Sequence, residues 1–199
     1  MATHRAIEAA SDAVIELLRD NYPAEVTDPQ LQFKVFTRSD FEIGLTAGVS
    51  LFVYRVYVDG SERAPDGRVG EDGRKQRPQL PVQLHFLLTA WAPTASLQHL
   101  LIGWMMRTLE DYPVLPAGLL NRRYDESDPV FWPDETVELS TAPMDTEDLF
   151  GLFDQLGDEY RLSVPYQARG IRIESARVIE EYEPVQERVR RYRKIEVSS

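Results

Sequence analysis

Cysteine is absent from the 199-residue chain, and histidine occurs three times, at His4, His85 and His99. Without a thiolate the protein forms no disulfide, no Cys-based zinc or iron–sulfur site and no cysteine nucleophile. Three histidines scattered along the sequence are too few for a histidine-rich metal centre. We therefore expect neither a metal ion nor a cofactor.

Long apolar runs are also missing. No segment approaches the roughly 18 consecutive apolar residues that a membrane span requires, and residues 1–8 lack the apolar core of a signal peptide. We expect synthesis in the cytoplasm and no direct membrane insertion. Hydrophobic residues still make up 43% of the chain. A chain of this length buries roughly 70% of its unfolded surface, so a core can form without cross-links.

The common catalytic signatures are absent: the sequence has no P-loop, Gly-x-Ser-x-Gly elbow, His-Glu-x-x-His or Gly-x-Gly-x-x-Gly motif. Carboxylate pairs are plentiful, but a long run of acids produces such pairs by chance. His85 falls on the polar side of an alternating run, which indicates a partly exposed histidine without a function. No catalytic residue can be assigned, and we expect no enzymatic activity. A small hydrolase is kept as a distant alternative.

Basic residues are missing from one long internal stretch. Residues 124–159 contain no lysine or arginine but twelve carboxylates, so this stretch carries −12 while the whole chain carries −11. Such a field repels nucleic acid and anionic membranes and attracts a basic partner. A solvated acidic face that keeps the protein soluble is the alternative interpretation.

Hydrophobic periodicity predicts helices and strands around one core. Steps of three and four between apolar residues predict helices over residues 3–22, 97–109 and 146–156. Alternation and β-branched or aromatic runs predict strands over residues 32–38, 48–59, 80–91, 135–141 and 160–173. We expect an α+β (mixed α/β) fold in a single domain, residues 1–177, with the strand at 48–59 in the centre of the sheet.

Several single residues carry local expectations. Gly103 lies inside a predicted helix, where glycine lowers helix stability by about 1 kcal/mol relative to alanine. A glycine at this position therefore predicts close packing against another backbone. The apolar residues fall on even positions before Arg169-Gly170 and on odd positions after it, which predicts a β-bulge there. Pro165 cannot donate a hydrogen bond, which predicts that its strand lies at a sheet edge or bends there. Asp145 is the expected cap of the helix 146–156.

The segment 60–79 differs from its surroundings, because it has four glycines, three Asp-Gly pairs counted from Asp59 and no aromatic residue. We expect a long mobile hairpin loop, since little apolar surface is available to offset the entropy of ordering it. It is either a tolerated surface insertion or a binding loop that becomes ordered on a partner. Its five candidate partner-binding residues are basic: Arg63, Arg68, Arg74, Lys75 and Arg77.

Residues 178–199 form a charged C-terminal arm with too few apolar residues for a core. The arm is first acidic and then basic, and it is either a disordered tail or a segment that binds a neighbouring subunit or another protein. Its candidate partner-binding residues are Arg188, Arg190, Arg191, Tyr192, Arg193 and Lys194.

Three consecutive blocks carry a resemblance to one protein family. They are Val49-Ser-Leu-Phe-Val-Tyr-Arg-Val with the Gly/Arg-rich loop after it, Leu80-Pro-Val-Gln-Leu-His-Phe-Leu-Leu-Thr-Ala-Trp, and Leu97-Gln-His-Leu-Leu-Ile-Gly-Trp-Met-Met-Arg-Thr-Leu. With an N-terminal helix, a late Asp-Leu-Phe helix and a closing Tyr-rich strand, the chain resembles the cap, or tail-terminator, proteins of contractile injection systems. These are the proteins of the antifeeding-prophage and Photorhabdus-virulence-cassette type, and the resemblance covers residues 5–175.

The resemblance implies a structural protein in which helices flank a mixed, mostly antiparallel sheet. It implies a homohexameric ring that sits on the last layer of inner tube and sheath, ends their polymerisation and remains in the assembled particle. The implied partners are further copies of the chain, the inner tube protein and the sheath protein, with no nucleic acid. A neck or head-completion adaptor of a contractile phage tail has the same implied fold and stays open as an alternative.

Overall fold

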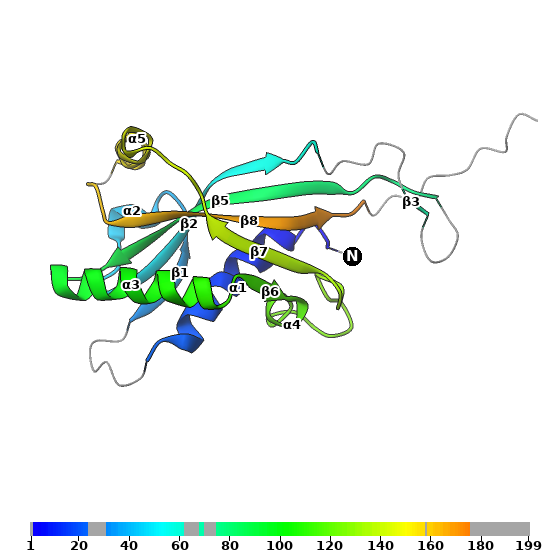
Figure 1. Cartoon of the computed structure of the whole chain (residues 1–199), viewed down its shortest axis with the longest axis horizontal. Helices are drawn as coiled ribbons and strands as arrows, with labels where there is room; N and C mark the ends of the chain where they lie inside the picture. Colours follow the sequence, from blue (N-terminus) through cyan, green and yellow to red (C-terminus); the bar gives the residue numbers. More distant parts are fainter. Residues whose placement is uncertain (1, 24–30, 62–67, 70–74, 158, 176–199) are drawn as a thin grey trace, which may run out of the picture.

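The chain folds into a sheet with helices on both faces (Figure 1). A computed structural model describes residues 2–23, 31–61, 68–69, 75–157 and 159–175. The helices are α1 (Ala6–Asn21), α2 (Asp40–Ile43), α3 (Ala95–Asp111), α4 (Ala117–Leu120) and α5 (Thr146–Leu156). The strands are β1 (Gln32–Phe36), β2 (Gly48–Val58), β3 (Arg68–Val69), β4 (Lys75–Gln76), β5 (Leu80–Trp91), β6 (Val114–Pro116), β7 (Thr136–Thr141) and β8 (Ser163–Ile173).

The main sheet has six strands in the order β1-β2-β5-β8-β7-β6. β1 and β2 are parallel, and the other neighbouring pairs are antiparallel. This arrangement confirms the mixed, mostly antiparallel sheet. The strand expected in the centre, β2, instead lies next to the edge strand β1, and β5 and β8 are the central pair. The long helices and strands that the sequence predicted are present, with bounds that differ by a few residues.

The larger core lies on the face of the sheet that α1, α3 and α4 cover. Four alanines of α1 are at most 2% exposed, so this helix lies close against the sheet. Alternate residues of β5, from Val82 through Phe86 to Leu88, point into this core together with Met105 and Leu109 of α3. Because Phe86 stacks on Tyr166 of β8 with ring centroids 6.1 Å apart, neighbouring strands also contact each other within the core.

A second, aromatic core lies on the opposite face, under α2 and α5. It is built from Phe36, Phe41, Leu87, Trp91, Phe153 and Leu156. The Phe36 and Phe41 rings meet edge to face at 5.4 Å, the geometry that aromatic quadrupoles favour. The indole Nε1 of Trp91 donates to Ser50 Oγ at 2.8 Å, so its buried polar atom is satisfied.

The β-bulge expected at Arg169-Gly170 is confirmed. Val82 pairs with Ile171 and Leu84 with Ala168, so β8 has one residue more than β5 between these pairs. Gly170 has φ +86°, and a Cβ there would lie 3.0 Å from the carbonyl oxygen of Thr136. Glycine is favoured here because it adopts this positive φ without strain and has no Cβ to crowd the Thr136 carbonyl of β7.

Two local expectations are not met within the chain: the sheet-edge position of the strand with Pro165 and the close packing of Gly103. β8 lies between β5 and β7 and is not a sheet edge. Its Pro165 is tolerated because pairing with β7 stops at Tyr166, and the Pro165 carbonyl accepts from the Ala142 N–H at 3.0 Å. Gly103 is exposed, and no heavy atom of the described residues lies within 4 Å of the position its Cβ would take. The predicted close backbone contact is therefore not made within the described chain.

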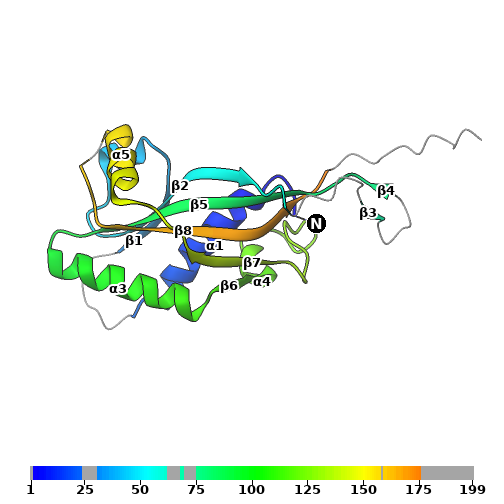
Figure 2. The same ribbon diagram turned by 45° about the horizontal axis from the view of Figure 1, so that its top comes forward.

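Three short elements were not predicted from the sequence. The four-residue helices α2 and α4 and the three-residue strand β6 are too short to show a period. The expected loop 60–79 contains the paired strands β3 and β4, which project far from the helices (Figure 2). Asp145 holds the N-cap position of α5, but its side chain forms no capping hydrogen bond with the described residues.

Ion pairs attach α1 to the segment that follows α4. Arg123 donates to Glu16 Oε1 at 2.6 Å and to Asp12 Oδ2 at 2.8 Å, while Arg122 pairs with Asp20. The Glu16 side chain is only 11% exposed, so its charge depends on these arginines. Burial raises the pKa of Asp12, and Arg123 opposes that rise.

We predict that Gly48→Ala lowers the free energy of unfolding by about 2 kcal/mol or more. Gly48 has φ +143°, and a Cβ would lie 1.9 Å from the backbone oxygen of Gln32, so the parallel β1–β2 pairing must shift. Urea denaturation of the purified protein measures the loss. The control is Gly118→Ala in α4, where the added Cβ meets no described atom within 4 Å. Equal stabilities of the two variants would contradict the prediction.

A second prediction concerns Arg123→Ala, which should reduce the free energy of unfolding by about 1–2 kcal/mol, because it leaves the Glu16 carboxylate without its closest partner. Without Arg123 the pKa of Asp12 should rise further. A carboxyl whose folded-state pKa is raised destabilises the fold most when it is ionised. The deficit should therefore shrink as the pH falls through the folded-state pKa of Asp12, as chemical denaturation at several pH values would show. A pH-independent deficit would refute this role of Asp12.

Candidate assembly surfaces

The structure describes three of the basic residues predicted to bind partners, all of them in the segment 60–79. Arg68 and Lys75 belong to β3 and β4, in which Arg68 pairs with Gln76 and Val69 with Lys75. Arg77 is exposed just before β5. Arg63, Arg74 and the arm residues from Arg188 to Lys194 lie outside the described residues. Their role in binding therefore stays a prediction.

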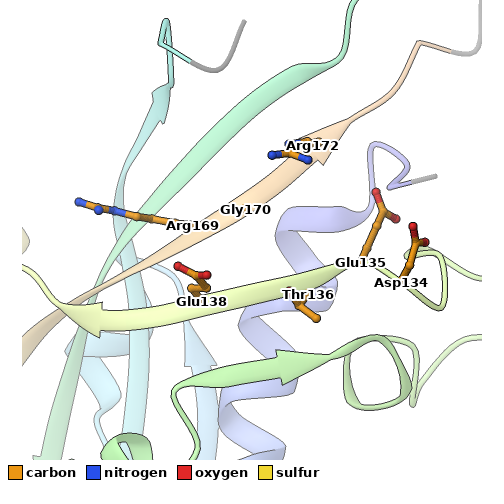
Figure 3. Close-up of a pocket in the computed structure, with 7 residues that line it drawn as sticks. All are labelled: Asp134, Glu135, Thr136, Glu138, Arg169, Gly170 and Arg172. Atoms are coloured by element: carbon orange, nitrogen blue, oxygen red, sulfur yellow. The ribbon is translucent and has the colours of Figure 1, made fainter. Parts of the chain in front are cut away.

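A polar hollow of about 390 Å³ lies beside the β-bulge (Figure 3). β8 contributes Arg169 and Arg172, and the chain around β7 contributes three carboxylates, Asp134, Glu135 and Glu138. The Trp132 N–H donates to Glu135 Oε2 at 2.7 Å, and Arg169 donates to Gln167 Oε1 at 3.2 Å. Because both signs of charge line it, the hollow has no strong preference for a cation or an anion.

The hollow lies near the end of the sheet where three distant segments meet. The Glu174 N–H donates to the Ala2 carbonyl at 2.9 Å, and the Gln79 side chain donates to Glu174 Oε1 at 2.7 Å. The N-terminal residues, the end of the 60–79 segment and the exit of β8 therefore lie together. Sequence reasoning missed this meeting point, since no local pattern links these three segments.

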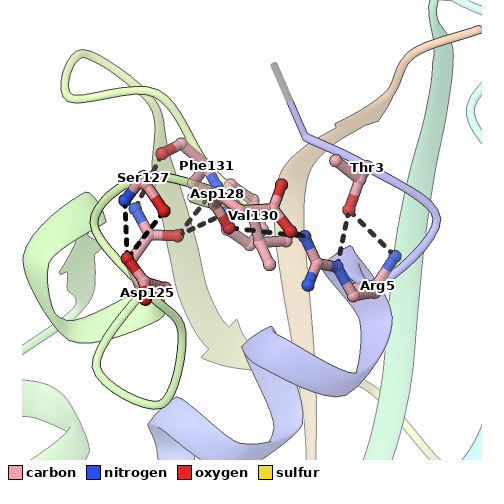
Figure 4. Close-up of polar contacts among 8 residues, drawn as sticks. Thr3, Arg5, Asp125, Ser127, Asp128, Val130 and Phe131 are labelled. Carbon is pink, nitrogen blue, oxygen red and sulfur yellow. Dashed lines mark hydrogen bonds and ion pairs between the residues drawn. The ribbon is translucent and has the colours of Figure 1, made fainter. Parts of the chain in front are cut away.

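Part of the acidic stretch is used within the chain (Figure 4). Arg5 donates to Asp128 Oδ2 at 2.8 Å, and Thr3 N donates to the Val130 carbonyl at 3.2 Å. Asp125 accepts from both the N–H and the hydroxyl of Ser127, and these hydrogen bonds lower its pKa. Asp128 therefore helps to hold the N-terminus, whereas Asp125 stabilises a turn and keeps its charge.

Two helices expose apolar side chains. On α3, Leu100 is 45% and Met106 40% exposed, whereas Leu101 and Met105 are buried, Met105 in the larger core. On α5, Phe150 is 47% exposed, and its ring packs edge to face on Tyr160 at 4.9 Å. The apolar residues of α3 are therefore divided, with Met105 in the larger core and Leu100 facing outward.

His85 lies half-buried on the sheet, as expected, with its ring 4.8 Å from the Tyr57 ring. Burial, Arg55 and Arg169 all lower its pKa. Within the described residues, no group of three His, Asp or Glu side chains is placed to hold a metal ion. No described helix is both long and apolar enough to cross a membrane.

The fold is similar to that of two solved terminator structures. The sheath/tube terminator of PVC, an extracellular contractile injection system, in its extended state matches with a TM-score of 0.62 and 16% identity, over 100% of this chain and 67% of that chain. The tube-terminating cap of the anti-feeding prophage matches with a TM-score of 0.57 and 16% identity, over 92% of this chain and 60% of that cap. No curated protein sequence is significantly similar to the chain.

The sequence itself matches the model of one family, the Pvc16 N-terminal domain, over residues 9–187. The match includes most of α1, the whole six-stranded sheet and α5. This family match agrees with the resemblance found in the sequence, which was based on residues 49–56, 80–91 and 97–109. The chain therefore belongs to the Pvc16 N-terminal domain family.

Proposed function

We propose that this protein is a structural cap of a contractile injection system. It ends the growth of the inner tube and sheath at one end of the particle. The observation that carries the proposal is the family match over residues 9–187, together with a fold similar to two proteins described as tube or sheath terminators. The chain spans 67% and 60% of those two proteins, so it corresponds to the part of them that it covers.

The proposed cap acts as a ring of six copies that contacts the inner tube protein and the sheath protein. It is made in the cytoplasm and incorporated into the particle there, and it has no catalytic role. A ring requires each subunit to present two different surfaces, one to each neighbour. Helices α3 and α5, which both expose apolar side chains, are candidates for such surfaces.

The edges of the sheet favour contacts through side chains over strand addition. The outer strands β1 and β6 have five and three residues. Arg19 of α1 donates to the Phe33 carbonyl of β1 at 3.0 Å, and Pro116 lies in β6. Short strands, charged side chains and proline are the usual means by which proteins protect a sheet edge.

We predict that deletion of the gene leaves particles whose tube and sheath vary in length or fall apart, because nothing then stops polymerisation. Electron micrographs of the deletion strain measure the length distribution. Complementation with the intact gene is the control and should restore one uniform length. Uniform, stable particles in the deletion strain would overturn the proposed function.

We propose in addition that the basic residues of the loop and the arm bind partners within the particle. The test is truncation after Arg177, which removes the basic cluster from Arg188 to Lys194. The thermal transition should be unchanged, whereas incorporation into particles should fall and become more sensitive to salt, since exposed ion pairs are screened. A truncated protein that caps particles as efficiently as the full chain would show that the arm is not needed.

A further inference from the structure

One part of the sheet border lacks the protection that the short outer strands provide. β1 pairs with β2 only at residues 48–52 of β2, so within the described chain residues 53–58 have a neighbouring strand on one side alone, which is β5. Figures 1 and 2 show this end of β2 at the border of the sheet. The outward backbone N–H and C=O groups of an edge strand are a template for a further strand. We call residues 53–58 the open edge.

One face of the open edge is apolar. Val56 and Val58 pair with residues of β5 that belong to the larger core, so both valines lie on that face of the sheet. Their two partners on β5 are at most 4% exposed, whereas Val56 is 46% and Val58 53% exposed. A strand beside the open edge can therefore bury two valines that the described chain leaves half-exposed.

The opposite face of the open edge is polar. Arg55 and Tyr57 lie on it, and the Arg55 guanidinium is 4.0 Å from the centre of the Tyr57 ring. Asp59 follows the edge directly, and its carboxylate accepts from Ser61 Oγ at 2.6 Å and from Gln83 Nε2 at 3.1 Å. Because a carboxylate has about four acceptor positions, it can accept from a further donor. A fitting strand therefore needs apolar residues on one face and charged residues on the other.

The C-terminal arm contains one segment with this pattern. Within residues 178–199, β-branched residues two positions apart occur once, as Ile195 and Val197. Such residues favour a strand, and at this spacing both side chains point to the same face. Lys194 and Glu196 alternate with them and would point to the opposite face. The segment therefore has the apolar face and the charged face that the open edge requires.

Charge favours the antiparallel direction for this strand. When the two β-branched residues of the arm lie beside the two exposed valines in that direction, Lys194 lies opposite Asp59. In the parallel direction Lys194 would lie opposite Arg55. Opposite charges across a strand pair stabilise it and like charges destabilise it, so the antiparallel register is preferred.

The position of this segment in the arm points to a neighbouring copy. β8 is separated from β2 by β5, so the place beside the open edge is roughly 14 Å from the end of β8, a distance that about five extended residues cover. The residues that follow at that distance, from Glu180 to Pro184, have glutamates on both faces and a proline. The matching segment comes only after residues 176–193, which when extended span roughly 60 Å. A domain of this size is about 40 Å across, so the segment can reach the next subunit.

We propose that residues 194–198 of one copy add an antiparallel strand to the open edge of the next copy and so join neighbouring subunits of the cap. This inference rests on the proposed function, because donor and acceptor differ and a ring is needed to satisfy every copy. Each chain supplies one arm and, among its described residues, one such edge. A closed ring therefore fills the open edges and leaves none for further growth. The arm of the same chain and strands of tube or sheath subunits are the competing occupants.

The absence of cysteine allows a direct test by cross-linking. Val56→Cys and Val197→Cys are introduced together, and particles that carry the variant are purified and mildly oxidised. The two positions are directly opposite in the proposed register, within the distance that a disulfide bridges. We expect a ladder of covalent cap multimers on non-reducing gels, collapsing to monomer on reduction. The matched control, Val56→Cys with Glu196→Cys, should give no ladder, because residue 196 points to the opposite face.

Co-expression of the two single variants shows which copy supplies the strand. Val56→Cys and Val197→Cys on separate chains should give covalent dimers in mixed particles, and neither variant should give dimers alone. A disulfide within one chain, cross-links to tube or sheath subunits, or uniform particles without a ladder from the double variant would each overturn the contact and leave the proposed function intact. Normal particle length in the deletion strain would instead remove the proposed function.

Truncations separate this strand from the basic cluster of the arm. A chain that ends after Lys194 keeps all five basic residues from Arg188 onward but loses the two β-branched residues. Its incorporation into particles should fall at least tenfold with an unchanged thermal transition, since the strand binds another copy. The control ends after Val197, keeps the strand and should change incorporation less than threefold. Incorporation of the shorter chain at the level of the parent would contradict the proposal.

Discussion

Burial of β5 on both faces is the constraint that the rest of the fold depends on. Leu84, Phe86 and Leu88 enter the larger core, while Leu87 and Trp91 enter the aromatic core. Side chains alternate along a strand, so a slip of one residue would exchange the two sets. The registers with β2 and β8 are therefore fixed together, and the extra residue of β8 at Arg169-Gly170 is accommodated by a bulge.

Charge has two separate uses in this molecule. Close to α1, arginines 122 and 123 neutralise carboxylates within the chain, and Arg5 does the same for Asp128. Away from these pairs, α5 presents Glu147 and Asp154 outward. The first group stabilises the fold, whereas Glu147 and Asp154 are exposed on the surface. Around the N-terminus, part of the acidic charge is therefore balanced by neighbouring arginines.

For a protein that ends a polymer, contacts through side chains on its surface have a physical advantage over strand addition at a sheet edge. An open sheet edge accepts any strand and is prone to continued growth. Here the outer strands β1 and β6 are short and Arg19 contacts β1, whereas residues 53–58 of β2 extend past β1. Contacts through side chains on a helix, whose spacing is fixed, avoid that continued growth.

The sequence by itself determined the long elements, because their periods of 2 and 3.6 record which residues are buried. It determined α1, α3, β2 and β5, and it located the bulge, since a change of parity at Gly170 is a local signal. Order in the sheet is not local, so Pro165 indicated an edge for a strand that lies inside. Gly103 is a second example. A glycine inside a helix predicted a close backbone contact, but the described chain does not supply one. Only the tertiary structure decided that α3 and α5 lie on opposite faces with their apolar side chains exposed, because that depends on which residues far apart in the sequence share a core.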